Sequence, residues 1–138
     1  MINRELIRLK VVQQVYVYYM NCDRKLDTAE KDLFMSLSKS YDLYLYMLGL
    51  MLELNRLAER SYATALSRYQ RLKEGEAPSS RFIDNKFIAQ LASNEQLRDF
   101  IDNQKKTWTD EEDYVRRLLQ RITDSDIYAE WMSGSEPT

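Results

Sequence analysis

Residues 3–19 decide the fold class, and they read Asn-Arg-Glu-Leu-Ile-Arg-Leu-Lys-Val-Val-Gln-Gln-Val-Tyr-Val-Tyr-Tyr. Apolar residues recur there at helical spacing, which predicts an amphipathic helix from about Arg4 to Asn21. Asn3 stands before it as an N-cap, because its side-chain oxygen can accept a hydrogen bond from an unpaired backbone N–H group. We expect the core-facing side of this helix to carry Leu6, Leu9, Val12, Tyr16 and Tyr19.

The composition favours an all-α protein with a single hydrophobic core. The chain has 138 residues, of which 44% are hydrophobic, with only 3 Gly and 2 Pro to interrupt helices. Its one cysteine, Cys22, excludes an internal disulfide, and without histidine the usual Cys–His nucleophile pairs and zinc sites are also excluded. No apolar run approaches the roughly twenty residues of a membrane span. We therefore expect a cytoplasmic protein with no membrane contact.

A second helical pattern begins near Asp27, which has capping-box spacing to Glu30. From there to Lys73 the sequence contains no Pro and one Gly, so the pattern continues far beyond the length of an ordinary helix. We expect a break at residues 36–40, where three serines compete for backbone hydrogen bonds, and a long central helix that restarts near Ser40. Its expected core face is Tyr41, Tyr44, Leu45, Leu48, Met51, Leu52, Asn55 and Ala58.

A loop at residues 73–80, which contains Gly75 and Pro78, separates two helical groups. The predicted organisation is one helical domain at residues 1–132, with an N-terminal group at 1–73 and a C-terminal group at 81–132. Residues 133–138 read as a linker or disordered tail. The C-terminal group should hold several short helices. One of them should begin with a capping box at Thr109–Glu112 and point Tyr114, Leu118 and Ile122 inward.

Positive charge gathers in two places although the net charge is −2. Arg4 and Arg8 lie one helical turn apart, close enough to contact the same anion. Residues 52–73 carry five basic and two acidic side chains, and residues 109–138 carry three basic and eight acidic ones. The first two regions are candidates for polyanion binding, while a solvated helix face explains them equally well. The possible secondary basic surface consists of Arg56, Arg60, Arg68 and Arg71.

No set of residues predicts catalysis, a metal site or a cofactor. The carboxylates at 110–113 are consecutive, so they point in different directions around a helix start and do not converge on one substrate. The helix dipole stabilises negative charge at that end. Glycine is too scarce for a loop that cradles phosphate groups. Trp108 and Trp131 are interpreted as anchors for the short helices, with base stacking as the less favoured alternative. The chain is therefore not expected to be an enzyme.

Two local patterns resemble a known family. The spacing Arg8-x-x-Val11-Val12-Gln13-x-Val15-Tyr16 resembles the opening helix of the NusB transcription antitermination factors. The run at residues 44–51, with Gly49 between apolar residues, is similar to a later NusB helix segment. Because a mid-helix glycine costs roughly 1 kcal/mol relative to alanine, Gly49 indicates that another helix packs closely there.

The resemblance implies an all-helical NusB-like bundle that binds boxA-like RNA and a NusE-type ribosomal protein within the RNA polymerase antitermination complex. By position it assigns RNA contact to Arg4 and Arg8, and less directly to Asn3 and Lys10. The resemblance covers about the first seventy residues. The chain as a whole resembles an extra N-terminal region of longer NusB-type proteins, in which residues 133–138 would lead to a C-terminal NusB domain. The alternative is therefore a structural helical module that packs on a NusB core or on a partner protein without binding nucleic acid.

Overall fold

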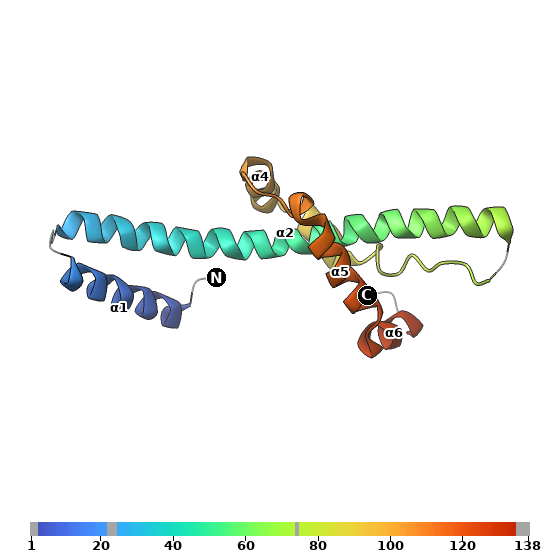
Figure 1. Ribbon diagram of the computed structural model, residues 1–138, viewed down its shortest axis with the longest axis horizontal. Coiled ribbons are helices and arrows are strands. Elements are labelled where there is room, and N and C mark those ends of the chain that lie inside the picture. The colour runs from blue at the N-terminus through green and yellow to red at the C-terminus, as the bar shows by residue number, and fades with distance from the viewer. Residues whose placement is uncertain (1–2, 22–24, 74, 135–138) are drawn as a thin grey trace. The chain divides into compact units, whose positions relative to one another are not determined.

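The computed structural model describes residues 3–21, 25–73 and 75–134, and this part of the chain contains helices and no β-strand (Figure 1). Helices take up 81% of the described residues, which confirms the predicted all-α class. Cys22 lies outside the described residues, as do positions 135–138 of the predicted tail. The elements are α1 (Arg4–Met20), α2 (Leu26–Leu72), α3 (Lys86–Ala92), α4 (Glu95–Asn103), the 3₁₀ helix η1 (Trp108–Glu111), α5 (Glu112–Thr123) and α6 (Asp126–Ser133).

The central helix α2 is continuous over 47 residues, so the predicted break at residues 36–40 was wrong. The hydroxyl of Ser40 donates a hydrogen bond to the carbonyl oxygen of Ser36 at 3.0 Å. This bond runs one turn back along the helix and leaves the helical backbone bonds in place, so the serines do not end the helix. Helix α2 also begins at Leu26, which places Asp27 in its first turn and not at its cap.

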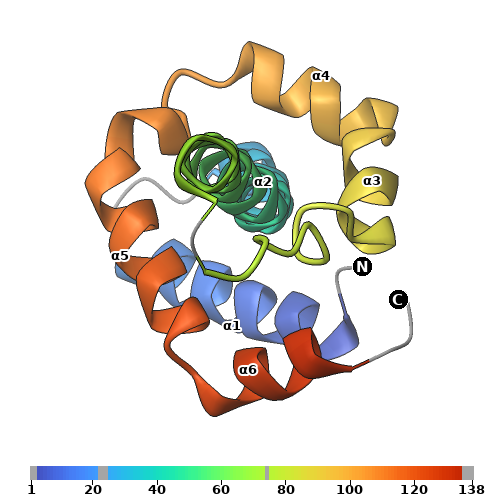
Figure 2. The same cartoon turned by 90° about the vertical axis from the view of Figure 1, so that its right-hand side faces the viewer.

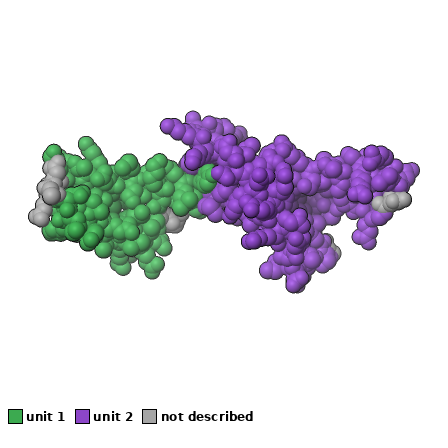
Figure 3. Space-filling model, in the orientation of Figure 1, with its two compact units in different colours: residues 1–46 green, residues 47–138 purple. Residues whose placement is uncertain are grey.

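The chain forms two compact units, residues 1–46 and residues 47–138, shown in green and purple in Figure 3. The boundary falls inside α2, whereas the sequence placed the main division at the loop of residues 73–80. That loop is confirmed as non-helical over its described residues. Lys73 and Gly75 have φ angles of +52° and +86°, so the chain leaves α2 through left-handed conformations that terminate a helix. Further along, α6 extends to Ser133, where the sequence predicted the start of the tail.

In the unit of residues 47–138, helices α3 to α6 lie around α2, as the view along α2 in Figure 2 shows. The core cluster joins one face of α2 to α5, and it consists of Leu50, Leu54, Leu57, Val115 and Leu119. The predicted core face of α2 was therefore only partly correct. Leu45 and Asn55 are buried, but Tyr41, Tyr44 and Met51 are exposed, and the main cluster uses a different face.

The register of α5 also differs from the prediction. Val115 and Leu119 are its buried residues, while Tyr114 is exposed and Leu118 and Ile122 pack at the edge of the cluster. The capping box lies at Thr107, two residues before the predicted one. There the Asp110 carboxylate accepts hydrogen bonds from the Thr107 backbone N–H and hydroxyl, at 3.0 and 3.2 Å. The intervening 3₁₀ turn η1 shifts the start of α5 and therefore its inward face.

Two local features shape the surroundings of α4, and the second confirms the predicted close packing at Gly49. The side chain of Asn94 caps α4 by accepting a hydrogen bond from the Leu97 N–H at 2.9 Å. Around Gly49, a Cβ atom would lie 3.7 Å from Ile101 of α4 and 3.9 Å from Trp108, so neighbouring elements do pack closely there. Among the described residues, no helix combines the length and the apolar character that crossing a membrane requires.

Candidate nucleic-acid and protein interface

The N-terminus of α1 presents the arginines that the sequence singled out. Arg4 and Arg8 are exposed and lie one turn apart on the same helix face. Asn3 caps the helix as predicted, since its Oδ1 accepts a hydrogen bond from the Leu6 N–H at 2.8 Å. Lys10 is half-buried and lies roughly 160° around the helix from Arg8, so it belongs to a different face.

Most of the predicted core face of α1 lies in solvent, so that prediction was largely wrong, although Leu6 is half-buried and Tyr19 lines a groove against α2. Leu9, Val12 and Tyr16 are 53%, 66% and 66% exposed, and α1 contains no buried residue. The opposite side of α1 faces α2 instead. There the two helices line an apolar groove of about 440 Å³ with Val11, Gln14, Val15, Tyr18, Tyr19, Leu26, Ala29, Glu30 and Leu33.

Four exposed residues of α1 form a stripe that is part cationic and part apolar. Arg4, Arg8, Val12 and Tyr16 follow each other at steps of four residues, so they lie along one face. The first half of this α1 stripe is cationic and the second half is apolar. Because α1 is apolar on two sides, a single neighbouring helix cannot bury all of its apolar surface.

The secondary basic surface lies on α2 in the other unit. Arg56, Arg60, Arg68 and Arg71 are spaced by four, eight and three residues, and Thr64 occupies the step that lacks an arginine. This spacing puts them on one face of the continuous helix, which we call the α2 basic face. The face borders a groove of about 650 Å³, whose opposite wall includes Glu76 and Pro78 from the loop after α2. The remaining lining residues are Arg60, Ser61, Thr64, Ala65, Arg68, Tyr69 and Leu72.

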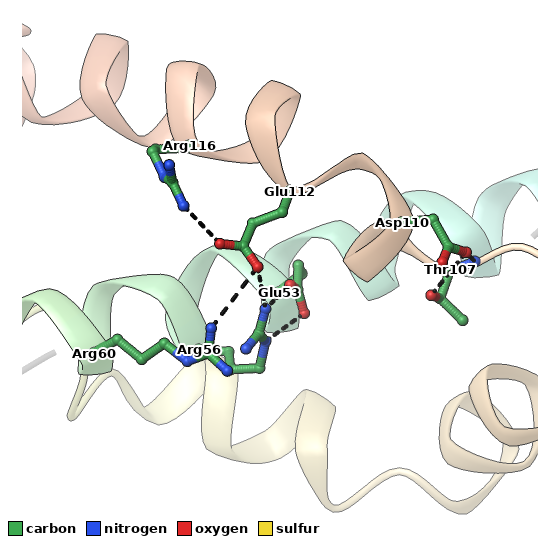
Figure 4. A network of polar contacts seen from close by, with 7 residues as sticks. All are labelled: Glu53, Arg56, Arg60, Thr107, Asp110, Glu112 and Arg116. Carbon is green, nitrogen blue, oxygen red and sulfur yellow. Dashed lines mark hydrogen bonds and ion pairs between the residues drawn. The ribbon is translucent and has the colours of Figure 1, made fainter.

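One carboxylate joins the α2 basic face to α5 (Figure 4). Glu112, the first residue of α5, accepts a hydrogen bond from Arg116 at 2.7 Å. Its other oxygen lies 3.6 Å from Arg56 Nη2 and 3.8 Å from Arg60 Nη1. Three guanidinium groups therefore surround a single carboxylate.

Of the three arginines, Arg56 has the most hydrogen bonds to carboxylates. It donates two hydrogen bonds to the largely buried Glu53, and this pairing is the main reason that its pKa lies above the ordinary arginine value. Arg60 and Arg116 are 63% and 66% exposed, so their attraction to Glu112 is weakened by solvent. The network therefore fixes Arg56 and leaves the other two guanidinium groups accessible.

Sequence reasoning missed Glu112 and Arg116 as members of this surface. Their four-residue spacing was a local signal for an ion pair. The proximity of Glu112 to Arg56 and Arg60 had no such signal, because it depends on how α5 packs across α2. The two tryptophans behave as the predicted anchors: Trp108 stacks on Tyr114 at 6.2 Å, and the Trp131 ring packs edge-on against Phe82 at 6.4 Å.

Over the described residues, no group of three or more His, Cys, Asp or Glu side chains is arranged to hold a metal ion. Comparison with known proteins finds no matching family model, no matching curated protein and no matching solved structure.

Proposed function

We propose that this chain is a non-catalytic binding module of the NusB type that takes part in transcription antitermination. The proposed partners are boxA-like RNA and a NusE-type ribosomal protein, and through them the RNA polymerase antitermination complex in the cytoplasm. The observation that carries the proposal is the α1 stripe, which presents arginine and apolar side chains to solvent along one helix face.

The cationic half of the α1 stripe suits RNA phosphates. Arg4 and Arg8 are exposed, and guanidinium groups bind phosphate oxygens through short, charge-assisted hydrogen bonds. Asn3 stabilises this end of the helix as its N-cap. Its side-chain oxygen accepts the hydrogen bond from the Leu6 N–H. Lys10 lies on another face, so in this proposal it adds to the long-range potential and not to the same contact.

The apolar half of the α1 stripe suits a protein partner. Val12 and Tyr16 are both 66% exposed and lie one turn apart on the same helix face. Tyrosine is enriched at protein interfaces, because its ring supplies apolar area while its hydroxyl remains hydrated or hydrogen-bonded. A second candidate function follows from this half alone: a structural module that packs on a NusB core or on a partner protein without touching RNA.

The RNA part is tested with the double variant Arg4→Ala/Arg8→Ala and boxA-like and scrambled RNA at two salt concentrations. We expect binding to weaken by about 1–3 kcal/mol and the salt slope to fall by about one to two units. Lys31→Ala/Lys86→Ala removes two exposed charges elsewhere and should bind like the wild type. Equal binding by the arginine variant and the wild type would remove Arg4 and Arg8 from the mechanism.

The protein part is tested with Val12→Ala/Tyr16→Ala in a titration against a NusE-type ribosomal protein. We expect weaker binding, because both side chains are exposed on the α1 stripe. Leu43→Ala/Met47→Ala alters exposed apolar residues of α2 and serves as the control. If the wild type binds neither RNA while the α1 apolar variant abolishes partner binding, the structural module is the correct function.

A further inference from the structure

We propose that the α2 basic face, together with Arg116 of α5, is a second binding surface for the phosphate backbone of single-stranded RNA. This inference rests on the proposed RNA-binding function and adds a site that the NusB resemblance does not assign. In this site the Glu112 carboxylate occupies the position that an RNA phosphate group takes when the strand is bound.

The arrangement around Glu112 is the first argument. Its carboxylate lies 2.7 Å from Arg116 and 3.6 and 3.8 Å from Arg56 and Arg60. Carboxylate and phosphate oxygens are both good acceptors for paired guanidinium N–H groups. The two longer contacts exceed normal hydrogen-bond distance, so Glu112 does not saturate Arg60, and it adds only a long contact to Arg56, which Glu53 already holds. A phosphate group can therefore replace Glu112 as their partner.

The continuity of the surface is the second argument. The α2 basic face extends from Arg56 to Arg71, a span of about 22 Å at 1.5 Å per residue. Stacked nucleotides rise about 3.4 Å each, so this span accommodates several phosphate groups. Five arginines face three carboxylates along the surface, and the carboxylates are Glu53, Glu76 and Glu112. Since Arg56 already engages Glu53, the remaining surface carries excess positive charge.

The groove beside this face is the third argument, and it favours RNA over an acidic peptide. Tyr69 is half-buried in the groove wall next to Arg68, and the Ser61 and Thr64 hydroxyl-bearing side chains line the same wall. Arginines interleaved with an aromatic ring are typical of sites that hold single strands without strict sequence preference, because every base can stack on the ring. The site should therefore tolerate changes of RNA sequence.

The experiment measures binding of a fluorescein-labelled oligouridylate to the full chain by anisotropy at two salt concentrations. We expect Arg68→Ala/Arg71→Ala to weaken binding about tenfold and to lower the salt slope by about 1.4 units, for two lost phosphate contacts. Lys31→Ala/Lys86→Ala removes the same charge outside the groove and should bind like the wild type. Circular dichroism checks that each variant retains its helices.

Glu112→Gln gives the sharper test. Removing the competing carboxylate frees Arg60 and Arg116, while Arg56 stays paired with Glu53, so we expect RNA to bind about threefold to tenfold more tightly. Glu111→Gln makes the same change of net charge at an exposed neighbouring position and should have a much smaller effect. Equal gains for Glu111→Gln and Glu112→Gln would overturn the role of Glu112.

Failure of this inference differs from failure of the proposed function. If Arg4→Ala/Arg8→Ala weakens binding while Arg68→Ala/Arg71→Ala does not, the second surface is wrong and the RNA-binding function stands. If Arg68→Ala/Arg71→Ala weakens binding while Arg4→Ala/Arg8→Ala does not, the α2 basic face is supported and the α1 assignment falls. Competition by oligoglutamate as effective as that by unlabelled RNA would overturn RNA as the occupant.

Discussion

The side chain of Ile101 covers Gly49, and its Cδ1 atom lies 3.7 Å from the position that a Cβ atom would take there. That distance is an ordinary van der Waals contact, so a methyl group fits without displacing Ile101. Close packing between α2 and α4 therefore exists at this glycine, and it still leaves room for alanine.

Gly49→Ala should raise the free energy of unfolding by about 0.5–1 kcal/mol, because alanine reduces the conformational entropy of the unfolded chain and keeps the helix. Gly49→Leu should lower it, since the larger side chain must displace Ile101 or Trp108. Urea unfolding followed by circular dichroism measures both changes. A destabilised Gly49→Ala variant would show that the contact is tighter than the structure indicates.

The capping box at Thr107 gives a test that separates the structure from the sequence expectation. Asp110→Ala removes the acceptor for the Thr107 N–H and hydroxyl, and we expect a loss of about 1 kcal/mol in unfolding free energy. Thr109→Ala alters the residue that the sequence predicted as the cap, and it should change stability by less than about 0.5 kcal/mol. The reverse order in thermal or urea unfolding would contradict the observed helix start.

Leu97 of α4 is 1% exposed, and its truncation should be among the most damaging single changes. We expect Leu97→Ala to lower the unfolding free energy by about 2–5 kcal/mol through lost burial and an unfilled cavity. Leu9→Ala removes the same atoms from a side chain that is 53% exposed, so it should cost well under half as much. Similar losses from both variants in urea unfolding would mean that the exposed face of α1 is covered in solution.

The partly buried phenol of Tyr128 should make the protein less stable at alkaline pH. Burial beside Phe82 raises the pKa of the Tyr128 phenol above its ordinary value. The unfolded phenol ionises at about pH 10, so as the pH rises above that value the unfolded state loses its proton first and stability falls. Below that pH the phenol is neutral in both states and contributes no slope. Tyr128→Phe should reduce the fall measured by urea unfolding between about pH 9.5 and 11.

The exposed variant Tyr16→Phe is the control for this measurement, because it removes a phenol that protein atoms cover much less. An alkaline fall that is unchanged by Tyr128→Phe would show that burial of this hydroxyl does not couple to folding.

Local sequence determined a large part of the secondary structure. Asn3 starts α1 where its side chain was expected to do so, since an N-cap needs only a hydrogen bond to a backbone N–H three residues away. The scarcity of Gly and Pro predicted the all-α class, and residues 73–80 predicted the loop after α2. The assignment of Arg4 and Arg8 to RNA comes from the family resemblance and stays a prediction.

Tertiary packing decided which helix faces are buried. On α1, Leu9, Val12 and Tyr16 have the spacing of a core face, yet they are exposed. Periodicity shows which side of a helix is apolar, but not whether another helix packs against that side. On α5 a 3₁₀ turn at Trp108 shifted the buried register to Val115 and Leu119. The meeting of Glu112 with Arg56 and Arg60 depends on residues more than fifty positions apart, and only the packing of α5 across α2 brings these charges together.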